Sequence, residues 1–341
     1  MSLPPEVLFH RFFRTEELTQ RDRANYKGKQ DLDVLEPSAR SLLVGIQESF
    51  NEALRNEKKS IPEHVPHPPF HLDYVDSAVP NALAFRYEGY SFIGITMALF
   101  KMLWDTCGRL SRSEALTTLL GVRLTPDEYE QIHVVLLQTQ LSFVVSHEYT
   151  HHVHGHVIPR GSDSIFPNEI LDCHASGSLR QQAQEVDADG YAVYHVLAHL
   201  IDGERRPTAA RLLGHEAASD AVQDEALFSS FVAAVGAFLL VCAPATVDSD
   251  RVYKLQHPPQ AARMNFVMQY AIRWCTQNRR RLETWTTIAR FQMLMSAAAV
   301  ATWGMNGGRD WGAQTAFLQS SHGSEYVRQL EECVKAHIQS L

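Results

Sequence analysis

The residues best placed to do chemistry in this chain of 341 residues are His147, Glu148 and His151, in the stretch S-H-E-Y-T-H-H-V-H-G-H. Two histidines four positions apart lie on one face of a helix, so both imidazoles can bind the same metal ion. The glutamate between them then turns toward a water on that ion. This H-E-x-x-H arrangement is typical of zinc sites, and it predicts Zn²⁺ held by the two histidines with Glu148 as general base.

A long apolar helix is expected to carry this motif. The run Thr125-Pro126-Asp127-Glu128 offers a capping threonine, a proline at the first helical position and acids in the first turn, which together mark a helix start. The apolar residues between Ile132 and Val145 leave this helix almost no polar face. A helix that is apolar on all sides belongs in the centre of a core. The two histidines are therefore expected where a buried helix meets a cavity.

A hydrolytic zinc ion usually takes three protein ligands, so the histidines need a partner. The extended pattern with a third histidine fails, because His154 and Val157 stand where glycine and histidine are required. Glu185 and Asp189 lie four positions apart on a second predicted helix, and we favour Glu185 as ligand with Asp189 bonded to the distal nitrogen of a ligand histidine. Three alternatives in the preceding loop remain open: Glu169, Asp172 and His174.

Other histidines near the motif are expected to be structural. His152, His154 and His156 follow the motif on other faces of the chain, which favours core or solvent partners. His195 and His199 repeat the four-residue spacing on the second helix. No glutamate follows His195, so the pair lacks the second element of the motif and is interpreted as structural.

The chain resembles the metallopeptidase family of HtpX and the type I CAAX prenyl proteases in four motifs, which occur along the chain in the family's order. It has H-E-x-x-H at 147–151, E-x-x-A-D at 185–189, N-A-x-A at 81–84 and H-P-x-x-x-x-R at 257–263. Leu83 replaces the family's aromatic residue. The resemblance implies a gluzincin, in which the third zinc ligand is a glutamate. Because members of the family commonly carry transmembrane helices, this chain would be a soluble or diverged member.

The resemblance also implies roles for residues outside the metal ligands. His257 would donate a hydrogen bond to the oxyanion, and Arg263 would brace the site. A substrate backbone would add as an extra strand to the segment formed by Asn81, Ala82, Leu83 and Ala84. The predicted activity is that of a metalloendopeptidase, which cleaves peptide or protein substrates with a zinc-activated water and a glutamate general base.

The alternative is a protein without catalytic activity, a zinc-binding regulatory or interaction protein with a vestigial protease site. The presence of Glu148 speaks against this alternative, because a purely structural zinc site has no need for a base.

Helices dominate the predicted fold. Strand candidates at 70–75, 81–87 and 90–96, the last two joined by Glu88-Gly89, predict a small antiparallel sheet. Helical spacing occurs at 36–58, 97–104, 113–120, from 125 through the motif, and at 182–200, 208–218, 226–243, 261–276, 282–303 and 325–339. The expected fold is mostly α with a small antiparallel sheet (α+β), and it has a zincin-like core. We expect an N-terminal helical region and linker at 1–69, the metallopeptidase core at 70–265, and a C-terminal helical region at 266–341.

Composition limits the classes of partner. With 45% hydrophobic and 21% charged residues the chain is typical of a globular protein, and its net charge of -8 argues against nucleic acid. The only tight basic run, Arg279 to Arg281, is interpreted as a solvated helix end. Five widely spaced cysteines without a C-x-x-C pair favour a reducing compartment, and hence the cytoplasm.

One segment is long and apolar enough to test for membrane insertion. Ala226 to Val247 contains no charged residue. Acidic residues flank it on both sides, and Ser229, Ser230 and Gly236 dilute its hydrophobicity. These features favour a buried core helix over a transmembrane span, so membrane association is not favoured.

Overall fold

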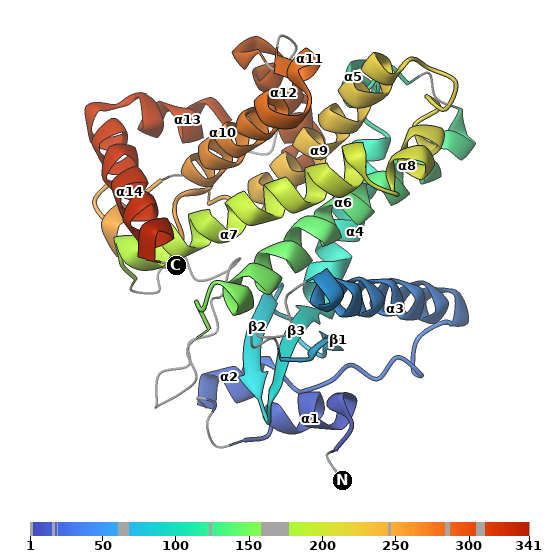
Figure 1. The fold of residues 1–341 in the computed structure, drawn as a ribbon, viewed down its shortest axis with the longest axis vertical. Coiled ribbons are helices and arrows are strands. Elements are labelled where there is room, and N and C mark those ends of the chain that lie inside the picture. Colours follow the sequence, from blue (N-terminus) through green and yellow to red (C-terminus); the bar gives the residue numbers. More distant parts are fainter. Residues whose placement is uncertain are drawn as a thin grey trace. The chain divides into compact units, whose positions relative to one another are not determined.

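The computed structural model describes residues 3–15, 18, 20–60, 68–122, 125–157, 177–244, 247–283, 287–304 and 311–340 (Figure 1). Its contacts divide the chain into two compact units. The first holds Met1–Met102 and Glu148–Leu171, and the second holds Leu103–His147 and Asp172–Leu341. Two continuous helices, α4 (Met97–Ser111) and α6 (Pro126–Val153), contribute residues to both units. The three regions expected from the sequence, at 1–69, 70–265 and 266–341, stay a prediction.

The first unit is built on a three-stranded sheet of order β1-β3-β2, formed by β1 (Phe70–Val75), β2 (Ala82–Tyr87) and β3 (Tyr90–Thr96). Strands β2 and β3 are antiparallel, as predicted, and Glu88 and Gly89 turn the chain with φ values of 48° and 84°. Strand β1 is parallel to β3, so the expectation of a purely antiparallel sheet is wrong for this pair. The alternation of residues within a strand predicts which face is buried, and it carries no information on which neighbour the strand pairs with.

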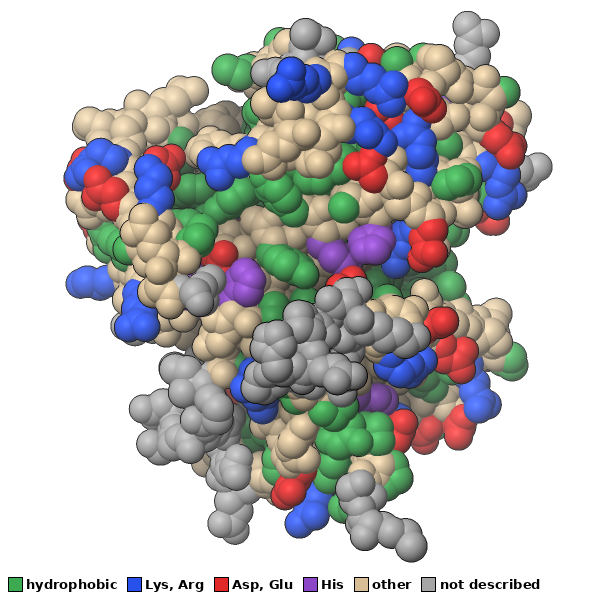
Figure 2. All heavy atoms as spheres, viewed as in Figure 1, with side chains coloured by type: hydrophobic (Ala, Val, Ile, Leu, Met, Phe, Trp, Pro, Cys, Tyr) green, Lys and Arg blue, Asp and Glu red, His purple; other side chains and the backbone are tan. Residues whose placement is uncertain are grey.

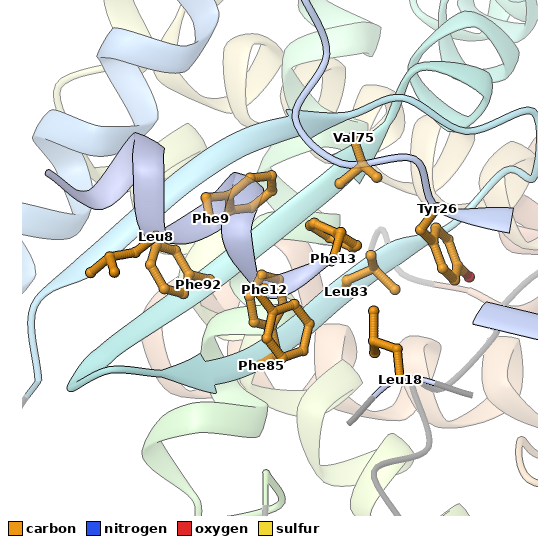
Figure 3. Close-up of a cluster of buried hydrophobic side chains, with 10 residues drawn as sticks. All are labelled: Leu8, Phe9, Phe12, Phe13, Leu18, Tyr26, Val75, Leu83, Phe85 and Phe92. Atoms are coloured by element: carbon orange, nitrogen blue, oxygen red, sulfur yellow. The ribbon is translucent and has the colours of Figure 1, made fainter. Parts of the chain in front are cut away.

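An aromatic core lies on one face of this sheet. The helices of the first unit are α1 (Pro5–Phe12), α2 (Gln20–Asn25) and α3 (Pro37–Ser60). Short α1 begins with a proline and places phenylalanines on the side that packs against the sheet (Figure 3). The rings of Phe12 and Phe85 are stacked with centroids 4.0 Å apart, and Phe9 contacts Phe92 edge to face. Burial of these rings fixes the short helix α1 against the sheet.

A side chain from α3 covers the outer edge of β1. The Asn51 carboxamide accepts a hydrogen bond from the backbone N–H of Leu72 and donates one to its carbonyl oxygen, at 2.8 and 3.0 Å. Tyr74 also donates from its hydroxyl to the carbonyl of Leu43 on α3. These bonds satisfy polar groups that an edge strand leaves unpaired.

The second unit is helical, and an apolar helix lies in its core. Besides its parts of α4 and α6, it contains α5 (Glu114–Leu119), α7 (Leu179–Leu197), a π-helical turn (Ala198–Asp202), α8 (Arg206–Leu212), α9 (Asp220–Cys242), a 3₁₀ turn (Val252–Lys254), α10 (Gln260–Asn278), α11 (Arg280–Glu283), α12 (Ile288–Trp303), α13 (Trp311–Gln319) and α14 (Ser321–Ser340). The helix predicted at 282–303 is thus two helices.

Helix α9 is the one described helix long and apolar enough to cross a membrane, and 83% of its most apolar stretch is buried inside the fold. It packs mainly against α12, and Gly236 allows the close approach: a Cβ there would lie 2.5 Å from the Met295 sulfur. On α6, the Gln140 amide donates to the Ala234 carbonyl of α9 at 2.8 Å. This packing is typical of a core helix.

The buried carboxylate of Asp224 lies beside the basic run Arg279 to Arg281. Asp224 on α9 has no exposed surface and is bonded by Arg206 and Arg281, while Arg279 pairs with Asp202. Figure 2 shows Lys and Arg side chains gathered with Asp and Glu over the part of the second unit that includes α11. The run follows the end of α10 and reaches solvent, as expected, and Arg279 and Arg281 also form ion pairs. A buried charge requires partners, and Arg206 of α8 and Arg281 of α11 supply them.

Candidate metal centre

The H-E-x-x-H motif lies near the end of α6. This helix begins where the sequence predicts, and the Thr125 backbone N–H donates to the Glu128 carboxylate at 2.5 Å. His147, Glu148 and His151 are buried, with 2%, 1% and 4% of their surfaces exposed. The apolar sequence of α6 explains this burial, because a helix covered on all sides carries its polar residues into the interior.

Helix α7 brings a carboxylate to the first histidine. The Nε2 atom of His147 lies 3.2 Å from Oε2 of Glu185, which is also buried. His147, His151 and Glu185 each offer one ligand atom, and these atoms all lie within 4.8 Å of one another. Neighbouring ligands on a tetrahedral zinc ion are about 3.3 Å apart, given metal–ligand distances of about 2.0–2.1 Å. The separation of 3.2 Å between His147 and Glu185 matches this spacing, and two imidazoles with a carboxylate are a donor set that suits zinc.

Asp189, one turn after Glu185 on α7, contacts the other side of His147. Its Oδ1 atom lies 3.0 Å from Nδ1 of His147, and Arg263 on α10 donates to both carboxylate oxygens at 2.9 and 2.7 Å. Burial by itself raises the pKa of Asp189, but the Arg263 guanidinium and His147 outweigh it and hold the pKa below its ordinary value. An ionised Asp189 keeps the Nδ1 proton of His147 in place, which leaves Nε2 as the ligand atom.

His257 reaches the same carboxylate from the segment before α10. Its Nδ1 atom lies 3.1 Å from Oε2 of Glu185, without the alignment of a hydrogen bond. Neither ring nitrogen has a hydrogen-bond partner among the described residues, although the ring is 9% exposed. A largely covered imidazole whose Nε2 has no partner in the described part of the chain fits a residue that meets a ligand or substrate.

Two residues that the sequence analysis did not identify hold the segment before His257. Gln182 on α7 donates to the carbonyls of Val252 and Leu255 at 2.8 and 2.7 Å, and its own carbonyl accepts from Tyr326 on α14. Gly177 lies so close to this segment that a Cβ would be 2.4 Å from the Leu255 carbonyl oxygen. Neither residue has a signal in the sequence, because a helical glutamine and a loop glycine are common everywhere.

His156 contacts His151, which differs from the expectation that the later histidines of the motif have only core or solvent partners. The two Nδ1 atoms are 3.0 Å apart. Helix α6 ends at Val153, and Gly155 adopts a φ of 72°, so the chain turns back and Val157 N–H bonds the His151 carbonyl. Gly155, immediately before His156, was the available sequence signal for this turn.

His152 has core partners, as expected. Its Nε2 atom lies 2.9 Å from the Phe92 carbonyl oxygen, and its ring meets Phe70 edge to face. His154 is half-buried. The alternative ligands Glu169, Asp172 and His174 lie outside the described residues.

The segment predicted to bind substrate lies at the start of β2. Asn81 and Leu83 have no exposed surface, and the Asn81 amide donates to the Tyr26 hydroxyl at 3.1 Å. Ala82 is also buried, and Ala84 is partly exposed. Toward the other end of the strand, Arg86 donates to the His152 carbonyl at 2.9 Å, which ties β2 to the end of α6.

Residues 55–271 match the sequence profile of Peptidase family M48. The chain belongs to peptidase family M48. This match confirms the resemblance to HtpX and the CAAX proteases, which are M48 members, and it spans every candidate site residue from Asn81 to Arg263. No curated protein and no solved structure was found to match the chain.

Membership in M48 has general consequences for the chain. The family consists of metallopeptidases that typically use zinc, so the protein is a zinc metalloprotease in general terms and acts on peptides or proteins. The M48 fold is zincin-like, and the helical chain with its small mixed sheet agrees with the predicted α+β class.

Proposed function

We propose that this M48 member is a gluzincin-type endopeptidase in which His147, His151 and Glu185 hold zinc and Glu148 is the general base. The observation that carries the proposal is the contact of His147 with two carboxylates of α7. Glu185 lies at Nε2, on the ligand side, and the ionised Asp189 lies at Nδ1. A ligand histidine in metal sites has this arrangement of one metal-side and one orienting partner.

The reaction we propose is hydrolysis of an internal peptide bond. When bound, zinc would lower the pKa of a coordinated water to about 7 and polarise the scissile carbonyl. Glu148 removes a proton from the attacking water as the new C–O bond forms, and it passes this proton to the amine nitrogen as the C–N bond breaks. Its burial keeps bulk water from competing for that proton.

His257 and Arg263 have supporting roles in this proposal. His257 donates a hydrogen bond to the oxyanion that develops on the substrate carbonyl, and such a donor contributes about 3 kcal/mol to the transition state. Its Nε2 atom, which has no hydrogen-bond partner among the described residues, supports this role. Arg263 acts through Asp189, whose charge it stabilises, so it is a positioning residue.

Strand β2 is the proposed site for the substrate backbone. The outer edge of β1 is covered by Asn51, whereas no strand in the described part of the chain pairs with the outer edge of β2. The bond from Arg86 to the His152 carbonyl keeps β2 beside the end of α6, just after His151. Because Asn81 and Leu83 are buried, the segment would bind substrate through its backbone, which gives affinity with little demand on side-chain sequence.

Zinc content and peptide cleavage of three variants test the proposal. Glu148→Gln is expected to keep zinc and lose cleavage, because the amide cannot take the proton. Glu185→Ala is expected to lose both. Glu216→Gln is a matched control: Glu216 follows His215 in an incomplete copy of the motif, is exposed, and should leave both properties unchanged.

The outcomes also distinguish the rival, a zinc protein without turnover. Full cleavage by Glu148→Gln would refute the general-base role. Zinc retained undiminished in Glu185→Ala would assign the third ligand to another residue. Zinc bound by the parent with no cleavage of an unbiased peptide library would favour the non-catalytic alternative.

We infer a cytoplasmic location from the use of cysteine. In the described part of the chain, Cys107, Cys242, Cys275 and Cys333 form no disulfide, and Cys173 lies outside that part. M48 members are often associated with membranes, but the burial of α9 supports a core role for the one helix that could span a bilayer. Recovery of the protein from cells without detergent, as a monodisperse species, is the expected result.

A further inference from the structure

Two histidines at the end of α7 have a geometry that the proposed reaction does not use. The Nε2 atoms of His195 and His199 lie 3.2 Å apart, and their ring centroids are 4.4 Å apart at an interplanar angle of 62°. Both side chains are half-buried, so solvent reaches them. The sequence alone favoured a structural role for this pair, because the spacing lacks a following glutamate.

A hydroxyl orients the first imidazole. Ser146 Oγ on α6 lies 2.8 Å from Nδ1 of His195, and the Tyr191 ring is parallel to the His195 ring. When the His195 proton is on Nδ1, the Ser146 hydroxyl can accept it in this hydrogen bond. Nε2 then carries the lone pair and faces His199. This is the arrangement that orients histidines in metal sites.

The backbone changes where the second imidazole is attached. Helix α7 ends at Leu197, and His199 lies in the π-helical turn from Ala198 to Asp202. Single π-helical turns are uncommon within helices and frequently occur at functional sites. Here the π-helical turn carries His199, whose Nε2 atom lies close to that of His195.

We propose that His195 and His199 form a second site for a divalent transition metal ion such as Zn²⁺, Ni²⁺ or Cu²⁺, distinct from the ligand set of His147 and Glu185. Imidazole nitrogens suit these metals. Nitrogens bound to one tetrahedral ion at about 2.0–2.1 Å lie about 3.3 Å apart, and the observed 3.2 Å matches this spacing.

Metal titration distinguishes this site from a hydrogen bond between the two rings, which has a similar length. The protein is first brought to one zinc ion per chain by dialysis and then titrated with Ni²⁺ in a calorimeter. The parent is expected to take up one Ni²⁺ ion in addition. His195→Gln and His199→Gln are each expected to lose that uptake. His322→Gln, which removes an exposed histidine of α14, should keep it.

The role of Ser146 gives the test a graded readout. Ser146→Ala removes the acceptor of the Nδ1 proton and is expected to weaken Ni²⁺ binding about 10–100-fold, the usual effect of losing such a partner. Circular dichroism of every variant establishes that the helices remain. No additional Ni²⁺ in the parent, or undiminished uptake by both glutamine variants, would overturn the proposal.

Glu185→Ala separates this proposal from the proposed function. If that variant loses its zinc and still takes up Ni²⁺ at the second site, both proposals stand. If it keeps its zinc, the assignment of the third catalytic ligand fails while the second site is tested unchanged by its own variants.

Discussion

The buried ion pair of Asp189 and Arg263 contributes to the stability of the second unit, and its carboxylate also orients the metal ligand His147. Substitutions at the two positions can measure these two effects separately. Asp189 has no exposed surface and Arg263 only 1%. Removing one member of such a pair leaves the other charge buried without compensation, which costs about 3–5 kcal/mol. Arg263→Met and Asp189→Leu should therefore each lower the free energy of unfolding by about that amount.

The double variant behaves differently. Replacing a buried ion pair by apolar residues of similar size is often neutral, so Asp189→Leu with Arg263→Met should cost much less than the sum of the single changes. His147 nevertheless loses the acceptor at Nδ1 that lies 3.0 Å away in the parent. Zinc affinity should then fall about 10–100-fold, or about 1.4–2.8 kcal/mol, even where the fold has regained its stability.

Urea denaturation of the zinc-free proteins measures the free energy of unfolding. Competition with a zinc chelator measures the zinc affinity. Arg328→Met is a matched control, because Arg328 on α14 is exposed and its ion pair with Glu325 contributes little. A double variant that regains stability and binds zinc as tightly as the parent would refute the orienting role of Asp189. If the single variants are as stable as the control, an unpaired buried charge does not lower the free energy of unfolding by the expected amount, and that part of the reasoning is refuted.

Three further changes probe other parts of the chain. Gln182→Leu removes the donor to the Val252 and Leu255 carbonyls, so kcat/KM for a peptide should fall while zinc content is unchanged; unchanged kcat/KM would show that this clamp does not position His257. Phe12→Ala removes a stacked ring from the core of the first unit and should cost about 3–5 kcal/mol in urea denaturation, whereas a cost below about 1 kcal/mol would mean that α1 is not docked. Burial and then Arg112 lower the pKa of His133 from 6.5, so the unfolded chain binds its proton more tightly and stability falls as the pH drops below about 6.5. His133→Phe should remove that part of the fall in unfolding free energy between about pH 7.5 and 5, and an unaltered pH profile would exclude His133 as its source.

Local patterns predicted the elements that carry the site. The spacing of His147 and His151, the capping run at Thr125 and the hairpin at Glu88-Gly89 each depend on residues a few positions apart, and the structure has a helix or turn at each. These features follow from backbone geometry, which a short stretch of sequence determines almost alone.

The relations between distant segments were not predictable in the same way. The parallel pairing of β1 with β3, the docking of α1 on the sheet, and the clamp from Gln182 to Leu255 depend on tertiary packing. Glu185 was favoured as the third ligand because it lies four positions before Asp189 on one predicted helix, and the family motif agreed with that choice; the structure places it in contact with His147. For His156 the signal was only local: Gly155 indicates a turn, but not the contact with His151 that the turn makes possible.

The composition of α9 has a consequence for synthesis. This helix is as apolar as a membrane span, and its cover α12 follows it in the chain. A nascent chain therefore presents α9 to its surroundings before α12 has been made, and at that moment a bilayer or a chaperone competes with the unfinished fold for the same surface. Gly236, by letting α12 approach closely, helps decide that competition in favour of the folded protein.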